Sequence, residues 1–218
     1  FVGITNGVVE FDSGPASVGS AVVFENSNIS YTSATFDSSN NKVVVAYKDG
    51  GNSGYGTAVV GTVSGTSISF GTPVVFEAAT IYYSSITFDS NSNKVVIAYR
   101  DDGNSNYGTA IVGTVSGTGI SFGSPAVFES AGINYTGITF DSNSNKVVIA
   151  YRDEGNSSYG TAVVGTVSGT NISFGTPVVY ESATIYYSSI TFDSNSNKVV
   201  VAYAVGFSNG SNVGTVSG

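Results

Sequence analysis

Residues 83–129 read YSSITFDSNSNKVVIAYRDDGNSNYGTAIVGTVSGTGISFGSPAVFE, and this stretch decides the fold. It contains four strand-like runs, at 84–90, 94–99, 109–115 and 120–129, which are rich in Val, Ile, Thr, Tyr and Phe. Clusters of Asp, Asn, Ser and Gly, which favour turns, separate the runs. The stretch therefore predicts a four-stranded antiparallel meander.

The same stretch returns at a constant period along the chain. Copies of the phrase that begins at Tyr83 begin at Tyr31, Tyr135 and Tyr187, each 52 residues from the next. A repeat of about 50 residues with four strands is typical of a β-propeller blade. The run from Val95 to Tyr99 is apolar without alternation, which indicates a strand buried on both faces, as in stacked blades.

The ends of the chain favour a ring closed by strand exchange. The fourth strand type ends at Glu25, Glu77, Glu129 and Glu181, so one copy precedes the first complete repeat, whereas the last repeat stops after its third strand. We therefore predict an all-β fold with a single domain over 1–218, a propeller with four blades of four antiparallel strands. Residues 1–30 would provide the closing strands for the C-terminal blade. Residues 1–7 resemble a further third strand and compete with 213–218 for that place. A larger ring of several chains or an elongated array in a fibre are alternatives.

Composition narrows the function classes. The chain has no Cys or His, so thiolate chemistry, disulfides and the commonest neutral metal ligand and general base are excluded. A net charge of −8 opposes binding to nucleic acid or to anionic membranes, and no apolar run is long enough to insert into a membrane. No cofactor is expected. Calcium binding is considered for the Asp-rich loop at 101–106, but this loop lacks the alternating carboxylates of known calcium-binding loops.

Candidate binding residues lie in the connections between strands. In the propeller interpretation, the second-to-third connection (DGGNSGYG, DDGNSNYG, DEGNSSYG and AVGFSNGSN) and the fourth-to-first connection (NSNIS, AATIY, SAGIN and SATIY) share one face and vary among the copies. This variation indicates either diversified recognition or drift of exposed loops. The candidate ligand-binding residues are Tyr55, Tyr82, Arg100, Asp101, Asp102, Asn104, Tyr107, Arg152, Asp153, Tyr159 and Tyr186.

The chemistry of these residues suits a sugar-binding surface better than an active site. Tyrosine offers an apolar ring face and a hydroxyl, while Asn, Asp and Arg supply directional hydrogen bonds. Tyr47 and Tyr99, at strand ends, are instead interpreted as packing residues between blades, and Asp89 with Lys94 as an ion pair across a hairpin. Because every acidic and basic candidate obeys the repeat, no unique catalytic pair stands out, and we do not expect an enzyme.

The segments GTVSGTSISFGTPVVFE (61–77) and ITFDSNSNKVVIAYRDDGNSNYGTA (86–110) resemble tandem repeats of proteins from marine bacteriophages and marine bacteria. In those proteins the repeats look like parts of tail fibres or surface proteins. The resemblance implies a location outside the cell or on the virion surface, and it carries over no ligand residues. The expected function is a non-catalytic, lectin-like module that recognises host or cell-surface glycans or receptors. The alternative is a structural module of a fibre or filament, with contacts between copies and no ligand of its own.

Overall fold

Strands make up nearly all of the regular structure. This computed structural model describes the backbone of residues 2–5, 8–11, 19–206 and 208–214 and the side chains of residues 19–206. Two short 3-10 helices, η1 (Gly50–Asn52) and η2 (Asp102–Asn104), lie in connections between consecutive strands. The strands are β1 (Val2–Thr5), β2 (Val8–Phe11), β3 (Ile29–Asp37), β4 (Lys42–Asp49), β5 (Tyr55–Ser64), β6 (Ser67–Phe70), β7 (Val74–Asp89), β8 (Lys94–Asp101), β9 (Tyr107–Ser116), β10 (Gly119–Phe122), β11 (Ala126–Asp141), β12 (Lys146–Asp153), β13 (Tyr159–Ser168), β14 (Asn171–Phe174), β15 (Val178–Asp193), β16 (Lys198–Val205) and β17 (Ser208–Gly214).

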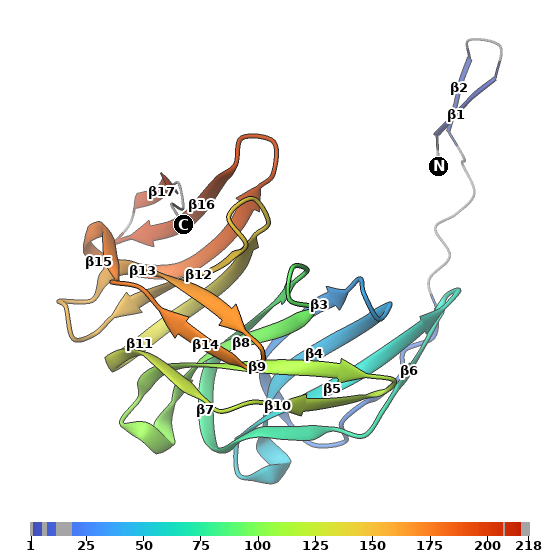
Figure 1. Cartoon of the computed structure of the whole chain (residues 1–218), viewed down its shortest axis with the longest axis horizontal. Coiled ribbons are helices and arrows are strands. Elements are labelled where there is room, and N and C mark those ends of the chain that lie inside the picture. The colour runs from blue at the N-terminus through green and yellow to red at the C-terminus, as the bar shows by residue number, and fades with distance from the viewer. Residues whose placement is uncertain (1, 6–7, 12–18, 207, 215–218) are drawn as a thin grey trace.

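Strands β3 to β17 form one antiparallel sheet of 15 strands, in which four units repeat the same pattern. We name them unit 1 (29–73), unit 2 (81–125), unit 3 (133–177) and unit 4 (185–214). The 16-residue strands β7, β11 and β15 join them. Each begins beside the third strand of one unit and ends beside the second strand of the next. Figure 1 shows the chain passing from unit to unit in this way.

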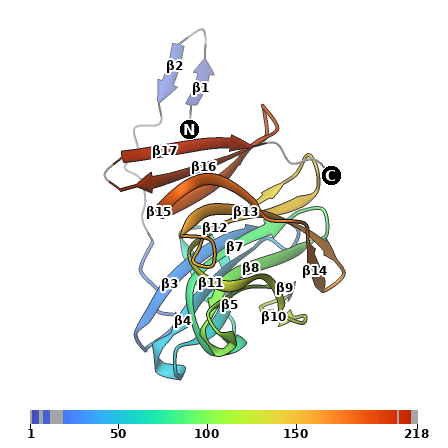
Figure 2. The same cartoon turned by 90° about the vertical axis from the view of Figure 1, so that its left-hand side faces the viewer.

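The prediction of a closed four-bladed propeller is wrong, although the all-β antiparallel character is confirmed. Strands β3 and β17 stand at opposite ends of the strand order, and the sheet is open between them (Figure 2). Residues 19–28, expected to include the closing strand, form no strand. The ring of Phe24 instead packs on Tyr47 and Phe70, with centroids 5.3 and 5.2 Å apart. This segment is thus held against unit 1, at the other end of the sheet from unit 4.

The two ends that compete for one strand position adopt different pairings. Strand β1 pairs with β2 in a separate two-stranded sheet, and β17 pairs with β16. Residues 1, 6–7 and 215–218, which belong to the same prediction, lie outside the described residues. Within the described backbone, therefore, neither end of the chain completes the other's unit.

The fourth strand of each repeat differs from the prediction in one respect. The predicted run 120–129 pairs with β9 in two parts, first as β10 and then as the start of β11. Residues 123–125 separate the two parts. Pro125 explains the break, because proline has no N–H to donate to the ladder. After the break the chain continues without a loop to Asp141. The predicted fourth-to-first loops at 78–82, 130–134 and 182–186 are therefore strand, whereas residues 26–28 of the first one are not.

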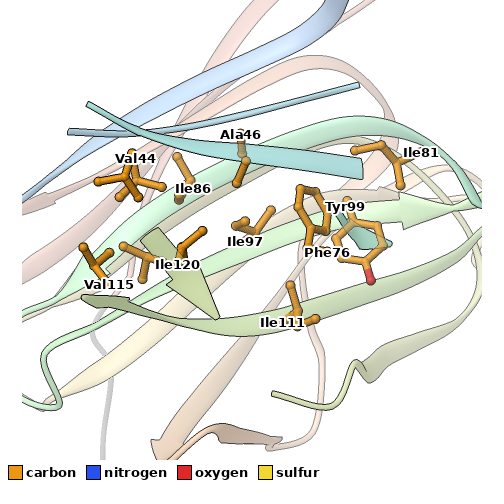
Figure 3. Close-up of a cluster of buried hydrophobic side chains, with 13 residues drawn as sticks. Val44, Ala46, Phe76, Ile81, Ile86, Ile97, Tyr99, Ile111, Val115 and Ile120 are labelled. Atoms are coloured by element: carbon orange, nitrogen blue, oxygen red, sulfur yellow. The ribbon is translucent and has the colours of Figure 1, made fainter. Parts of the chain in front are cut away.

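The apolar core lies between neighbouring units. Val44 and Ala46 of β4 share a buried cluster with Ile97 and Tyr99 of β8 (Figure 3). The same arrangement recurs between units 2 and 3 and between units 3 and 4. All five side chains from Val95 to Tyr99 are fully buried. The predicted burial of the second strand on both faces is confirmed, and so is the packing of Tyr99 between units. The same prediction is wrong for Tyr47, which packs on Phe24 and on residues of unit 1 itself.

A tyrosine and a glutamate connect each joining strand to the following unit. The ring of Phe76 packs on Tyr99, with centroids 5.3 Å apart, and the Tyr99 hydroxyl donates to Glu77 Oε2 at 2.9 Å. The hydroxyls of Tyr151 and Tyr203 donate in the same way to Glu129 and Glu181. Unit 1 departs from this pattern. Glu25 accepts from the backbone N–H of Ser27, and the buried Tyr47 hydroxyl has no partner among the described residues.

Acidification should stabilise the protein through these glutamates. Burial raises the pKa of Glu77 and Glu129, and the hydrogen bonds from Tyr99 and Tyr151 only partly oppose it. The folded state therefore binds these protons more tightly than the unfolded chain does. The stabilisation is fully present below the ordinary glutamate pKa, about 4.3, and is lost as pH rises through the raised folded pKa. We expect a higher Tm near pH 4 than at pH 7, measured by thermal unfolding.

The double variant Glu77→Gln with Glu129→Gln should reduce this difference in Tm, because glutamine still accepts the hydroxyl but does not titrate. Burial also raises the pKa of Asp101 and Asp153, so part of the difference should remain, although the lowered pKa of Glu154 acts in the opposite direction. Glu25→Gln is the matched control, since no tyrosine hydroxyl donates to this residue. An unchanged difference in the double variant would contradict the assignment.

The tight hairpin turns are held by local hydrogen bonds and not by ion pairs. Asp89 accepts from the N–H groups of Asn91 and Ser92, and the aspartates of the other three turns do the same. Asn93 closes the turn with φ of 55°, a conformation that asparagine tolerates. Asp89 and Lys94 are register partners, but no ion pair within 4.0 Å joins them in the described chain. The predicted salt bridge is therefore wrong, because the turn amides occupy the carboxylate.

Candidate functional site

Each unit contains a β-bulge at the tyrosine that opens the repeat. The pairing of β7 with β8 shifts register between Tyr82 and Ser85, and Tyr83 lies in this shift with φ of 52°. The tyrosines at 31, 135 and 187 have φ of 52°, 53° and 50°. A positive φ is rare for an aromatic residue and costs on the order of 1–3 kcal/mol. Bulges of this kind redirect side chains, and four copies redirect four tyrosines in the same way.

The bulges bring six tyrosines into one continuous row across the four units. The bulged tyrosines of neighbouring units have ring centroids 5.1–5.3 Å apart. Tyr82 and Tyr186, each one residue earlier, lie 5.4 and 6.3 Å from Tyr31 and Tyr135. We call this row the tyrosine line: Tyr31, Tyr82, Tyr83, Tyr135, Tyr186 and Tyr187.

The line is accessible, and hydrogen bonds between units hold it in place. Tyr187 is 76% exposed and Tyr31 and Tyr186 are more than a third exposed, whereas the other three rings are half-buried. The hydroxyl of Ser84 donates to the carbonyl of Tyr31, and that of Ser188 donates to the carbonyl of Tyr135. These bonds fix the bulge of one unit against the bulge of another, so the rings form a preorganised surface.

Three of the seven basic residues lie at this line. Lys48 Nζ is 3.7 Å from the ring centroid of Tyr82, and Arg100 Cζ is 5.1 Å from the same centroid. Arg152 Cζ lies 5.2 and 5.5 Å from the centroids of Tyr135 and Tyr186. Cations over tyrosine faces at these distances are stabilising. The other four basic residues are the lysines of the tight turns: Lys42, Lys94, Lys146 and Lys198.

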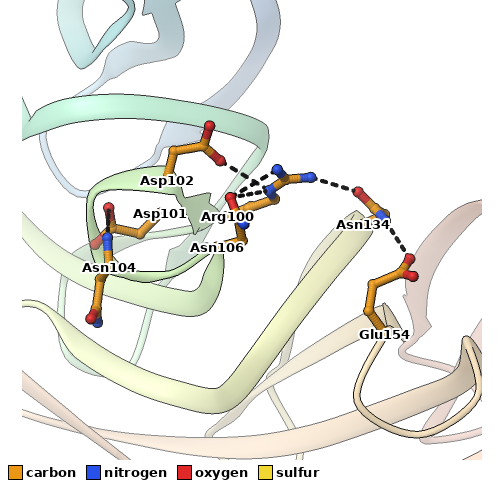
Figure 4. Close-up of polar contacts among 7 residues, drawn as sticks. All are labelled: Arg100, Asp101, Asp102, Asn104, Asn106, Asn134 and Glu154. Carbon is orange, nitrogen blue, oxygen red and sulfur yellow. Dashed lines mark hydrogen bonds and ion pairs between the residues drawn. The ribbon is translucent and has the colours of Figure 1, made fainter.

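Arg100 is held by a dense set of hydrogen bonds (Figure 4). Its Nε donates to Asp102 Oδ1 at 3.0 Å, and its Nη2 donates to Asn106 Oδ1 at 2.8 Å. Its Nη1 reaches the next unit and donates to Asn134 Oδ1 at 3.1 Å. Asn134, which is buried, donates in turn to Glu154. Arg100 therefore connects units 2 and 3 beside the ring of Tyr82.

Arg152 occupies the equivalent position in unit 3 with fewer bonds. Its Nε donates to Glu154 Oε1 at 2.5 Å, and Ser158 Oγ donates to the other oxygen of this carboxylate at 3.2 Å. Burial works to raise the pKa of Glu154, but the hydrogen bonds from Arg152 and Asn134 outweigh it, so the pKa lies below its ordinary value. Glu154 therefore carries its charge at neutral pH.

Two tyrosines of the line, Tyr83 and Tyr135, have raised hydroxyl pKa values. Burial raises the pKa of Tyr83, and the proximity of Tyr31 adds to the rise. Burial likewise raises the pKa of Tyr135, against the opposing effect of Arg152. These two rings therefore present neutral hydroxyls that can both donate and accept hydrogen bonds to a ligand.

The structure separates the predicted binding residues into two groups. Tyr82, Arg100, Arg152 and Tyr186 lie at the tyrosine line, and Asp102 pairs with Arg100. The other predicted residues lie in their own loops or at the starts of strands. Asp101 and Asp153 are buried and accept from backbone N–H groups of their own loops, and Asn104 supplies one of these N–H groups. Tyr55, Tyr107 and Tyr159 begin β5, β9 and β13 and have no ring contact within residues 19–206.

Sequence reasoning missed the bulged tyrosines and the residues that support them. Tyr31, Tyr83, Tyr135 and Tyr187 recur at the exact repeat period, which is a visible signal, but a strand pattern does not show that a bulge aligns them. Asn134 and Glu154 were missed because their partners come from different units. Among the described residues, no group of three or more acidic side chains is placed to hold a metal ion. No helix in that part of the chain has the length and apolar character to span a membrane.

Comparisons with known proteins support the fold alone. No family model matches the chain, and no curated protein matches it, so the resemblance to phage and marine bacterial repeats has no support from these comparisons. A crystal structure of a protein of unknown function from Dyadobacter fermentans DSM 18053 is similar, with a TM-score of 0.60 and 12% identity. The similarity covers 97% of this chain and 65% of that one, so this chain spans about two thirds of the length of the solved protein.

Proposed function

We propose that this chain is a non-catalytic binding module that holds cell-surface glycans on the tyrosine line. The single observation that carries the proposal is the row of six tyrosines, aligned by four bulges of unfavourable backbone conformation. Bulky residues held in such unfavourable backbone conformations cluster at functional sites. Aromatic rings that carry hydroxyls suit the apolar faces and hydroxyl groups of sugars.

The shape of the line favours an extended ligand. The rings continue from unit 1 to unit 4 with nearly constant spacing between units, so a sugar chain that contacts one unit is directed along the next. Each contact is weak by itself, but several contacts on one chain raise the total affinity through effective concentration. We therefore propose an oligosaccharide or polysaccharide ligand at the surface of a cell or in an extracellular setting.

Replacement of Tyr187 by alanine tests this proposal. Tyr187 is the most exposed ring of the line, so its loss should remove contact area with little effect on folding. We expect a five- to twentyfold weaker affinity for any glycan that the folded chain binds, first identified on a glycan array and then measured by calorimetry. This corresponds to roughly 1–2 kcal/mol for one aromatic contact.

Tyr107→Ala is the matched control, since the Tyr107 ring makes no aromatic contact with the rings of the line within residues 19–206. Binding that survives Tyr187→Ala but is lost in Tyr107→Ala would refute the proposed site. A folded chain that binds no glycan at any protein density would refute the proposed function.

The second candidate function is a structural module of a fibre or filament. It is favoured by one observation, namely that the bulged rings pack against one another and so also stabilise the contact between units. In that case Tyr83→Ala should lower the free energy of unfolding by about 2–4 kcal/mol, as for other half-buried aromatic residues, and no glycan should bind. A measurable glycan affinity that depends on Tyr187 would exclude this alternative.

A further inference from the structure

Arg152 lies beside Tyr135 and Tyr186 of the tyrosine line, and its terminal nitrogens are not used in hydrogen bonds to the described residues. In its equivalent Arg100, both terminal nitrogens donate, to Asn106 and to Asn134. In Arg152 only Nε has a partner within residues 19–206, and neither Nη1 nor Nη2 donates to any described residue. The difference arises from the sequence. Asn106 is replaced by Ser158, which binds Glu154 instead of the arginine, and Asn134 is replaced by Tyr186.

The guanidinium of Arg152 is nevertheless held in a fixed position. Glu154 fixes Nε, and Asn134 and Ser158 fix Glu154 in turn. The rings of Tyr135 and Tyr186 both lie within 5.5 Å of the guanidinium carbon. A guanidinium that is anchored through Nε presents its two terminal nitrogens as a planar fork, the geometry that matches a carboxylate or a sulfate.

We infer that the glycan on the tyrosine line is acidic, and that Arg152 binds its carboxylate or sulfate group through Nη1 and Nη2. This inference rests on the proposed function, because it requires a sugar chain beside Tyr135 and Tyr186. The two rings would contact the sugar while the fork binds the acidic substituent of the same or the next residue. The two terminal nitrogens allow two parallel hydrogen bonds to one anionic group.

The charge distribution limits Arg152 to a short-range role and does not itself attract an acidic ligand. The chain carries −8 overall, and the paired charges of Glu154 and Arg152 cancel for a ligand that is still far away. Long-range attraction therefore does not bring an anion to Arg152. Recognition then depends on direct hydrogen bonds. At the other end of the line, Lys48 has no carboxylate within 4.0 Å in the described chain, because Gly50 stands where units 2 and 3 have Asp102 and Glu154. This lysine provides a second positive charge for an extended acidic ligand.

The experiment compares acidic polysaccharides with their neutral counterparts. Polygalacturonate and its methyl ester test a carboxylate, and dextran sulfate and dextran test a sulfate, with affinities measured by calorimetry. We expect one acidic polymer to bind at least tenfold more tightly than its neutral counterpart. Arg152→Gln should reduce that difference to threefold or less. Arg152→Lys should not restore it, because lysine keeps the charge but lacks the fork.

Lys198→Gln is the matched control, since it removes one positive charge from a tight turn of unit 4 and should keep the preference. Equal affinities for acidic and neutral polymers would overturn the inference while leaving the proposed glycan binding intact. A loss of preference in Lys198→Gln as large as in Arg152→Gln would also overturn it, because the effect would then be general charge. If the folded chain binds no polymer of either kind, the proposed function and this inference both fail.

Discussion

Replacement of Tyr99 by alanine should lower the free energy of unfolding by about 3–5 kcal/mol, the range for a large aromatic side chain removed from a core. Tyr99 is fully buried in the cluster between units 1 and 2. Its ring packs on Phe76 and its hydroxyl is the donor to Glu77, so the change leaves both a cavity and a half-buried carboxylate without its donor. Denaturant unfolding followed by circular dichroism measures the effect.

Tyr99→Phe separates the two contributions. It keeps the ring and removes only the hydrogen bond, so we expect a loss of about 1–2 kcal/mol. Tyr107→Ala, at a half-buried position outside the core clusters, should cost clearly less than Tyr99→Ala. Equal losses for Tyr99→Ala and Tyr107→Ala would show that the contact between units 1 and 2 is not the stabilising core described above.

Addition of a single methyl group at Gly108 should destabilise the protein by about 1–3 kcal/mol, the usual cost of overpacking. A Cβ atom built on Gly108 would lie 2.5 Å from Cε2 of the Phe128 ring. Phe128 is buried against Tyr151, with ring centroids 5.2 Å apart, so it has little room to move away. The positions Gly56 and Gly160 meet Phe76 and Tyr180 at the same 2.5 Å.

Gly175→Ala provides the control for Gly108→Ala. A Cβ atom there would meet only the carbonyl oxygen of Val164 at 3.8 Å, an ordinary contact. We expect a change within about 0.5 kcal/mol at this exposed position. If Gly108→Ala unfolds at the same denaturant concentration as Gly175→Ala, the close approach of the aromatic ring to β9 is wrong.

Local features of the fold were predictable because short-range chemistry determines them. The Asp-Ser-Asn-Ser-Asn turn after Phe88, the unbroken apolar run from Val95 to Tyr99 and the burial of Tyr99 all follow from residues that are close in sequence. The order of the strands within a unit follows for the same reason, because antiparallel neighbours are joined by short turns. The open sheet was not predictable from the same signals. A repeat period specifies the unit, but closure depends on how far each unit rotates relative to the previous one.

The candidate site, too, was predictable from the sequence only in part. The sequence indicated Tyr82, Arg100, Arg152 and Tyr186 through their residue types and their variable connections. It gave no reason to separate them from Tyr107, whose surroundings are similar in sequence. The separation depends on the bulge at Tyr83, which turns one tyrosine of each repeat toward the same row.

By itself, the sequence determined an all-β protein of repeated antiparallel units with a buried second strand, because alternation, turn residues and a 52-residue period act over short distances along the chain. Only the tertiary structure decided that the sheet stays open, that Phe24 packs on Tyr47 of unit 1, and that tyrosines 52 residues apart form one line. Each of these depends on contacts between units, where packing and backbone strain outweigh the local preferences of individual residues.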